Sequence, residues 1–261
     1  MDRSRTAKMS DEKSRGWVML RAVRDVWRTL RDDCRAIPRS AWWRWGATLV
    51  IGFVVCCVLS FFIARFTRDR AEHGLQSWDE RQIVWFAENG PISFQNAILL
   101  ESAGNLMYLI PLTIAASIIA IRKHRPLIAI TIQLSYWLQR PIVLVGWETW
   151  NRPRPKLIEN GVAAPPLHSF PSGHAALCIA VYGFLVYLWL RSSRSVVEKL
   201  FGVIVVALLT AAVSLARVRL GSHWPSDIIA GAVLGVLWVS VVIFAYRSAA
   251  NQSEEGHARS A

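Results

Sequence analysis

The sequence has little charge for its length. Charged residues make up 18% of its 261 residues, whereas soluble domains carry about 25%. Hydrophobic residues reach 53%. This composition excludes an ordinary soluble domain and a disordered chain. The first apolar run begins near residue 45 and no cleavage site follows it, so we expect membrane insertion without a signal peptide.

Cysteine is scarce, and the common metal and nucleotide motifs are missing. The four cysteines lie in basic or apolar segments, which argues against a disulfide framework, and their spacing does not fit a zinc site. There is no P-loop, no HExxH and no acidic cluster for metal ions. We therefore expect a site that uses neither a metal ion nor another cofactor.

Basic residues are in excess, with 30 Lys and Arg against 18 Asp and Glu. In a soluble protein this balance would suggest nucleic acid as a partner. In an apolar chain, basic residues mostly mark cytoplasmic loops. The expected partner is therefore the membrane, with no nucleic acid.

Six apolar stretches are each near the length of about 20 residues that crosses a bilayer as a helix. They cover residues 45–64, 103–121, 126–147, 173–190, 200–216 and 228–246. The fold expected is all-α, a polytopic bundle of six transmembrane helices. The stretches 173–190 and 200–216 are marginal, so we expect both to be buried among the other helices.

A basic amphipathic helix is expected before the first span, over residues 16–37. Apolar residues recur there at steps of three or four, and arginines fill an opposite face: Trp17, Leu20, Val23, Trp27, Leu30 and Ile37 against Arg24, Arg28, Arg31 and Arg35. This pattern favours a helix on an anionic membrane surface, and the alternative is a solvated helix packed on the protein's own loops. The expected division is a basic segment 1–44, a membrane domain 45–246 and a short tail 247–261.

The distribution of Lys and Arg predicts the orientation. With both termini in the cytoplasm, 20 basic residues lie inside and nine outside, and Arg140 falls within a span. This bias favours cytoplasmic termini. The unusual polar segments 147–172 and 217–227 then both face the exterior. A bacterial inner membrane is the expected location, and the segment 66–102 should lie partly along the outer interface.

Three polar clusters occur in these outer segments. Asn151–Lys156 combines arginines, whose forked donors match phosphate oxygens, with prolines that fix the backbone. Pro171-Ser172-Gly173-His174 precedes an apolar helix, where free N–H groups can bind an anion and a histidine can donate a proton. Each cluster also has a simpler explanation. The first can be a solvated basic loop, and Ser172 in the second can be a helix cap.

The third cluster runs from Arg217 to Asp227. Asp227 follows His223 by four residues, and a carboxylate near a histidine can fix one tautomer and free the other nitrogen for attack. The simpler explanation is that Asp227 caps a helix. Together, the three clusters supply the cations, nucleophile and acid that phosphoryl transfer without a metal needs.

At these residues the sequence resembles the type 2 phosphatidic acid phosphatase (PAP2) superfamily. The family pattern is K-x6-R-P, then P-S-G-H, then S-R-x5-H-x3-D. The matching parts here are Arg154-Pro155, Pro171-Ser172-Gly173-His174 and Arg217-x5-His223-x3-Asp227. The resemblance covers roughly residues 103–246. Soluble vanadate-dependent haloperoxidases share the motif, but the membrane spans argue against that activity.

The resemblance implies a role for each matching position. His223 would be the nucleophile that forms a phosphohistidine, Asp227 would orient and stabilise it, and His174 would protonate the leaving group. The phosphoryl oxygens would be bound by Arg154, Arg217, Ser172 and the backbone of Gly173. The family needs no metal ion, and its membrane members have six helices with the site at the outer face.

Two positions depart from the family pattern. Ala216 replaces the serine of S-R, which removes one hydroxyl. Trp147 stands at the family lysine, seven residues before Arg154, and cannot supply a positive charge. Losing one preorganised donor lowers the rate by about 100- to 1000-fold. We expect Arg152 or Lys156 to substitute, ahead of Arg140, which lies two helical turns deeper. Trp147 itself is either an interfacial aromatic or a residue that stacks on the lipid.

The function expected is that of a membrane lipid phosphatase acting at the extracytoplasmic face on a lipid phosphate or diphosphate that enters from the bilayer. Undecaprenyl diphosphate, phosphatidic acid, phosphatidylglycerophosphate and a lipid A phosphate are all compatible with the sequence. One alternative is a lipid phosphotransferase with the same site. The other is a catalytically impaired lipid-binding homologue, which only Trp147 supports.

Overall fold

The structure is a computed structural model that describes residues 3–158, 161 and 168–260. The described part of the chain is helical and contains no strand, which confirms the all-α prediction. Within these described residues, nine α-helices follow one another: α1 Arg3–Ala36, α2 Arg39–Arg70, α3 Gln76–Asn89, α4 Phe94–Glu101, α5 Leu106–Arg122, α6 Pro126–Thr149, α7 Gly173–Leu190, α8 Val196–Arg219 and α9 Pro225–Ser260. A π-helical turn, Ala71–Leu75, joins α2 to α3, and a 3-10 turn, Ser102–Gly104, joins α4 to α5.

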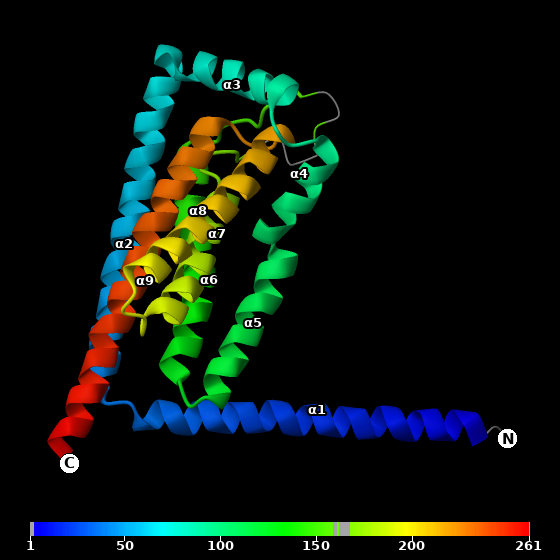
Figure 1. The fold of residues 1–261 in the computed structure, drawn as a ribbon, viewed down its shortest axis with the longest axis vertical. Coiled ribbons are helices and arrows are strands. Elements are labelled where there is room, and N and C mark those ends of the chain that lie inside the picture. The colour runs from blue at the N-terminus through cyan, green and yellow to red at the C-terminus, as the bar shows by residue number, and fades with distance from the viewer. Residues whose placement is uncertain (1–2, 159–160, 162–167, 261) are drawn as a thin grey trace.

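Six helices in the described chain are long and apolar enough to cross a membrane, which confirms the six predicted spans. They are Arg39–Asn89, Phe94–Arg122, Pro126–Thr149, Gly173–Leu190, Val196–Arg219 and Pro225–Ala250. The first includes a corner at the π-helical turn, where Gly74 takes a φ of 103°. Glycine adopts this left-handed conformation without the steric penalty of a side chain. The chain therefore turns sharply from α2 into α3, which runs across one end of the bundle (Figure 1).

The core lies where α2, α6, α7 and α9 meet. Trp238 of α9 is fully buried there, and its indole N–H donates to the carbonyl of Ser135 at 2.9 Å. Trp45 of α2 packs into the same cluster and donates to the hydroxyl of Thr131 at 3.1 Å. Buried indole groups need such partners because an unmade hydrogen bond in an apolar interior is unfavourable.

Helix α8 is less buried than the sequence predicts. Burial was expected for both marginal spans, and much of α7 does lie inside the bundle. Most of α8 instead presents apolar side chains outward, among them Leu200, Phe201 and Leu208. The prediction for 200–216 was wrong because the hydropathy of a short span does not show whether lipid or protein surrounds it.

Helix α1 lies across the end of the bundle opposite α3 (Figure 1). Val26 and Leu30 pack against a small cluster formed by α5 and α6. Leu20, Val23 and Trp27 remain exposed, each at 60% or more. Part of the apolar face of α1 therefore packs on the bundle, and the rest of it is exposed. This arrangement fits a helix at the membrane interface. The side chains of residues 3–16 lie outside the described set.

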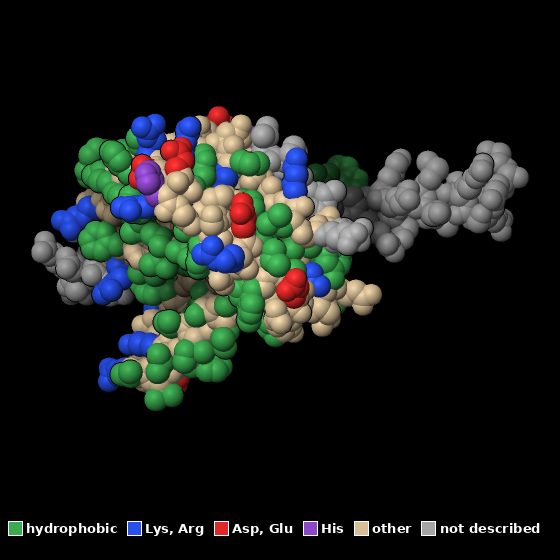
Figure 2. Space-filling model, turned by 90° about the horizontal axis from the view of Figure 1, so that it is seen from above, with side chains coloured by type: hydrophobic (Ala, Val, Ile, Leu, Met, Phe, Trp, Pro, Cys, Tyr) green, Lys and Arg blue, Asp and Glu red, His purple; other side chains and the backbone are tan. Residues whose placement is uncertain are grey.

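Both ends of the chain lie at the same end of the molecule (Figure 1). The tail expected over residues 247–261 continues α9 as helix to Ser260. The opposite end, seen from above in Figure 2, carries Lys, Arg, Asp and Glu side chains interspersed among hydrophobic ones. The polar segments singled out in the sequence lie at this end.

Candidate active site

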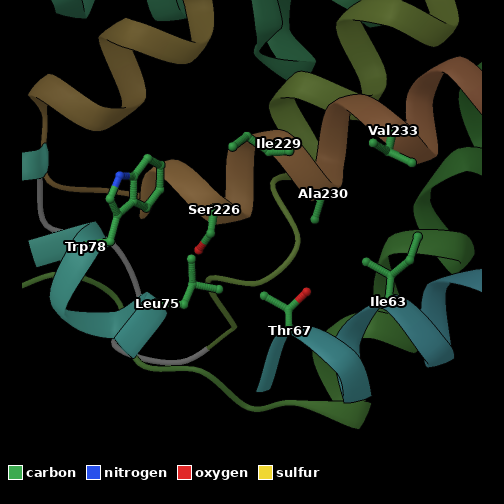
Figure 3. A pocket seen from close by; sticks show the side chains of 8 residues that line it. All are labelled: Ile63, Thr67, Leu75, Trp78, Ser226, Ile229, Ala230 and Val233. Atoms are coloured by element: carbon green, nitrogen blue, oxygen red, sulfur yellow. The ribbon is translucent and has the colours of Figure 1, made fainter. Parts of the chain in front are cut away.

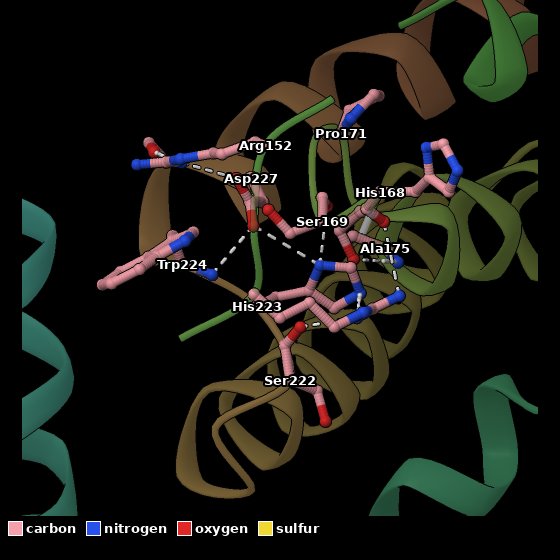
Figure 4. Close-up of polar contacts among 12 residues, drawn as sticks. Arg152, His168, Ser169, Pro171, Ala175, Ser222, His223, Trp224 and Asp227 are labelled. Carbon is pink, nitrogen blue, oxygen red and sulfur yellow. Dashed lines mark hydrogen bonds and ion pairs between the residues drawn. The ribbon is translucent and has the colours of Figure 1, made fainter. Parts of the chain in front are cut away.

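His223 is held by the short loop between α8 and α9 and is 1% exposed. Its Nδ1 lies 2.8 Å from the carbonyl oxygen of Ser169. Since a carbonyl oxygen only accepts hydrogen bonds, Nδ1 carries the proton and Nε2 keeps its lone pair. Nε2 lies 3.4 Å from Nη1 of Arg154. The imidazole is thus oriented with Nε2 toward the Arg154 cation. Figure 4 shows the contacts of His223 with Ser169 and Asp227.

Burial also keeps His223 neutral. The pKa of His223 falls from its usual 6.5 to about 4. Desolvation is the largest cause, the guanidinium groups of Arg217 and Arg154 also lower this pKa, and the Asp227 carboxylate opposes them. A neutral imidazole is the form that can attack an electrophilic phosphorus.

Asp227, in the first turn of α9, is fully buried behind His223. Its Oδ2 accepts a hydrogen bond from the backbone N–H of Trp224 at 2.9 Å and lies 3.5 Å from Nδ1 of His223. The carboxylate therefore both caps the helix and faces the proton of the histidine. The two explanations that the sequence left open for Asp227 describe the same placement.

Arg152 holds the other oxygen of Asp227. Its Nη1 donates to Oδ1 of Asp227 at 2.6 Å, and its Nη2 donates to Oδ2 of Asp79 at 2.6 Å. The guanidinium is 2% exposed and lies over the rings of Trp150 and Trp224. These contacts do not support the prediction that Arg152 binds phosphate. They make it the cation that compensates two buried carboxylates.

Asp79, which the sequence did not single out, comes from α3, and both residue and side chain are fully buried. Besides Arg152, it binds Ser226, accepting from its backbone N–H at 2.9 Å and from its hydroxyl. A chain of contacts thus runs from α3 through Arg152 to Asp227 and His223. No local pattern could reveal this link, because Asp79 and Ser226 are 147 residues apart.

Arg154 lies beside Nε2 of His223. Its Nη1 donates to the carbonyl of Ser222 at 2.5 Å and its Nη2 to the carbonyl of His168 at 3.3 Å. Burial lowers the pKa of Arg154 from its usual value, with a further lowering by the charge of Arg217. The guanidinium remains positively charged, since the pKa of an arginine in water is above 12. The geometry fits the predicted role in phosphate binding.

His174 lies in the first turn of α7, with its ring centroid 6.4 Å from that of His223. Its Nε2 is 2.9 Å from Oδ1 of Asn105, the residue that precedes α5. Gly104 allows this approach, because a Cβ there would come within 3.1 Å of Cδ2 of His174. Asn105 is therefore a second residue of the site that the sequence analysis missed.

Ser172 and Gly173 form the N-terminus of α7. The Ser172 hydroxyl accepts from the backbone N–H of Ala175 at 3.5 Å, and its own N–H donates to the carbonyl of Asp227 at 2.9 Å. Ser172 is fully buried and acts here as a helix cap, as the simpler explanation had it. Gly173 lines the pocket described below, so the positive end of the α7 dipole faces it.

Arg217, at the end of α8, forms an ion pair with Glu101 of α4. The side chain of Glu101 is 12% exposed, and its role was not predicted. The charge of Arg217 acts on both histidines and on Arg154, so it lies near the site even though a carboxylate holds it. An incoming phosphate would compete with Glu101 for this guanidinium.

A cavity of about 330 Å³ unites these groups. It lies among α5, α6 and α7 and is lined by Gly104, Leu106, Gln139, Arg140, Pro141, Val143, Leu144, Trp147, Arg154, Gly173, His174, Leu177 and His223. Both histidines, two arginines and Gln139 line it, and most of its other lining residues are apolar. This arrangement suits a molecule with an anionic head and a hydrocarbon tail.

Trp147 forms part of the cavity wall rather than a free interfacial anchor. Its indole N–H donates to the carbonyl of Pro171 at 3.0 Å, and its ring stacks on that of His168 with centroids 5.8 Å apart. Lys156, one of the two expected substitutes for the family lysine, is exposed and does not line the cavity. The cation of α6 that does line it is Arg140.

A second cavity of about 340 Å³ lies between α2 and α9 near the α2–α3 corner (Figure 3). Its lining is almost wholly apolar and includes Trp78 and Ile229, while Ser226 faces it from the start of α9. Neither histidine of the site lines it. Within the described residues, no group of three or more His, Cys, Asp or Glu side chains is arranged to hold a metal ion.

Comparison with known proteins gives one family match and two similar solved structures. Residues 127–250 match the sequence model of the PAP2 superfamily. A search of the curated proteins gives no match. Among solved structures, the chain is similar to the first transmembrane PAP2 type phosphatidylglycerolphosphate phosphatase from Bacillus subtilis. The TM-score is 0.60 and the identity 23%, over 73% of this chain and 93% of that one.

A second structure, LpxE from Aquifex aeolicus, is 20% identical over 64% of this chain and 93% of its own, with a TM-score of 0.48. The Bacillus structure confirms the six-helix membrane fold. The region that matches the family model contains Arg154-Pro155, the P-S-G-H sequence and the R-x5-H-x3-D sequence in the family order. Over residues 127–250, the sequence of this integral membrane protein matches the PAP2 superfamily.

Proposed function

We propose that the protein is a lipid phosphatase that works through a phosphohistidine. The observation that carries this proposal is the orientation of His223: its Nδ1 is held by the Ser169 carbonyl, and its Nε2 points into the cavity beside Arg154. A purely structural histidine would not need a free nitrogen directed at a buried cation. The family match and the fold of the Bacillus phosphatase support the same conclusion.

The first chemical step transfers the phosphoryl group to the enzyme. Nε2 of His223 attacks phosphorus as the bond to the ester or anhydride oxygen breaks, and Arg154 and the N–H groups at the start of α7 stabilise the charge on the phosphoryl oxygens. The imidazolium form of His174 gives the leaving oxygen its proton and becomes neutral. Asp227 stabilises the positive charge that develops on His223.

Water completes the reaction. Neutral His174 takes a proton from a water molecule, whose oxygen attacks phosphorus as the P–N bond to His223 breaks. The products are inorganic phosphate and the dephosphorylated lipid, and both histidines return to their starting forms. All these groups belong to the chain itself.

The lipid would enter from the bilayer. The cavity lies among membrane helices and has apolar walls formed by residues such as Leu106, Leu144 and Leu177. The excess of Lys and Arg near the termini favours a site that faces the exterior, in a bacterial inner membrane.

Phosphate release in detergent tests the proposal. The purified protein and its His223→Ala variant would be assayed with EDTA on a panel of lipid phosphates and diphosphates. We expect release by the wild type and only background release by the variant. His73→Ala is the matched control, since His73 is exposed on the α2–α3 corner. A well-folded wild type that releases phosphate from none of these lipids would contradict the proposal and favour a binding role.

A further inference from the structure

Arg140 is a cation in the middle of a membrane helix. It lies seven residues before Trp147 on the same face of α6, which places it about 10 Å deeper along the helix axis. Both residues line the cavity that contains His223. In the described part of the chain, no carboxylate forms an ion pair with Arg140. An arginine at membrane depth is unfavourable unless an anion or a polar site compensates it.

Gln139, next to Arg140, provides a second and independent indication. It is 2% exposed, it lines the same cavity, and its side-chain nitrogen is buried without a hydrogen-bond partner. A buried amide donor left unsatisfied is unfavourable and calls for an acceptor. Tyr136, one helical turn before Arg140 on α6, carries a hydroxyl and adds no negative charge.

The position of Trp147 relates this cation to the reaction. The family motif places a lysine where Trp147 stands, close to the reacting phosphate, and no cation replaces it at that level of α6. Arg140, two helical turns deeper on α6, instead provides a positive charge on the lining of the same cavity. The cavity therefore has a cation beside His223, Arg154, and a second one deeper on α6.

This distribution discriminates between substrates. A lipid with a single phosphate would put hydrocarbon against Arg140 and Gln139 and leave both groups without an acceptor. A lipid that carries a second phosphate between the reacting phosphate and the tail would put anionic oxygens next to Arg140 and Gln139. Arginine binds such oxygens through paired hydrogen bonds.

We propose that Arg140 and Gln139 form a second anion-binding subsite, which selects lipids whose reacting phosphate is followed by another phosphate toward the tail. This inference rests on the proposed function. Lipid diphosphates and lipids with a phosphodiester before the terminal phosphate share this chemistry. Phosphatidic acid and isoprenoid monophosphates lack it.

Two substrate pairs with matched tails test the subsite. One pair is an isoprenoid diphosphate and its monophosphate, and the other is phosphatidylglycerol phosphate and phosphatidic acid. We expect the wild type to favour the member with two phosphates by at least about tenfold in kcat/KM in one pair, which also identifies the source of the second phosphate. Arg140→Gln should reduce that preference about tenfold, mainly through KM, and Arg140→Lys should restore part of it.

The ratio within a pair is an internal control, because both substrates are measured on the same protein sample. Arg122→Gln, at the exposed end of α5, removes a charge outside the cavity and should leave the ratio unchanged. A lipid bisphosphonate that resists hydrolysis should inhibit the wild type more strongly than a monophosphonate with the same tail, which tests the subsite without any variant.

The outcomes separate the two proposals. Phosphate release with no preference in either pair, or an equal loss on both members in Arg140→Gln, overturns the subsite and leaves the phosphatase intact. No release from any of the four lipids overturns the phosphatase and the subsite together.

Discussion

At the scale of residues, Asp79 determines how firmly the nucleophile is supported. It shares Arg152 with Asp227, so a residue of α3 fixes the carboxylate behind His223. Such outer contacts orient catalytic groups without touching substrate. Asp79 is therefore a positioning residue.

We predict that Asp79→Asn lowers kcat about tenfold and leaves KM nearly unchanged. The amide keeps the shape of the side chain but removes the charge that balances Arg152, so Arg152 shifts and Asp227 loses its orientation. Steady-state kinetics on one lipid substrate measures both parameters. Glu88→Gln, an exposed change on the same helix, is the control. A variant with unchanged kcat would show that α3 only encloses the site.

The acidic limb of the pH–rate profile should reflect the lowered pKa of His223. Because the neutral imidazole is the nucleophile, kcat/KM is retained as the pH falls below 6.5 and is lost near the pKa of about 4. Asp227 raises this pKa, so Asp227→Asn should move the limb to a still lower pH, at a reduced maximal rate. A limb near pH 6.5 in the wild type would contradict the buried, neutral His223.

The sequence predicted the residues of the three motifs but not their partners. The structure brings His223, Asp227, His174 and Arg154 together, as the motif spacing implied. It assigns Arg152 to the carboxylates instead of to phosphate. Asp79, Glu101 and Asn105 went unnoticed because each meets its partner across 69 or more residues, and such pairings depend on how helices pack.

At the scale of elements, close packing between α9 and the turn before α7 holds the motifs in register. A Cβ at Gly231 of α9 would lie 2.3 Å from the carbonyl oxygen of Ser172, which belongs to the backbone and cannot rotate away. Small residues allow such helix contacts in membranes. The position of Ser172, and with it the start of α7, therefore depends on this glycine.

Gly231→Ala should destabilise the protein and displace the site. Overpacking of this kind costs about 1–3 kcal/mol, so the thermal midpoint in detergent should fall by several degrees and phosphate release should decrease. Gly46→Ala is the matched control, because nothing lies within 4 Å of its added Cβ and alanine favours a helix. Equal midpoints for the two variants would show that α9 moves away from Ser172 freely.

Hydropathy predicted all six spans because each is a continuous apolar run of bilayer length. It did not show whether lipid or protein surrounds a span, as α8 illustrates. It also did not show the corner at Gly74, because the residues on both sides of this glycine are mostly polar and nothing in their hydropathy marks the end of one helix and the start of the next. The amphipathic pattern of residues 16–37 was informative because α1 is a helix that keeps apolar side chains exposed, as expected for a helix on a membrane surface.

At the scale of the whole molecule, both termini and α1 lie at one end, and the site lies near the other (Figure 1). The basic residues divide unequally between these ends, 20 against nine. This asymmetry predicts that the end with α1 is cytoplasmic. In that orientation, the excess of positive charge and the arginine face of α1 would lie against anionic lipid headgroups.

Single cysteines in a background without the native cysteines would test this orientation. Glu88→Cys lies on α3 at the end with the site, and Lys123→Cys lies between α5 and α6 at the end with α1; both positions are exposed. A membrane-impermeant maleimide should label Glu88→Cys in sealed right-side-out vesicles and Lys123→Cys only after permeabilisation. The reverse pattern would put the site in the cytoplasm, so that the substrate would have to come from the inner leaflet.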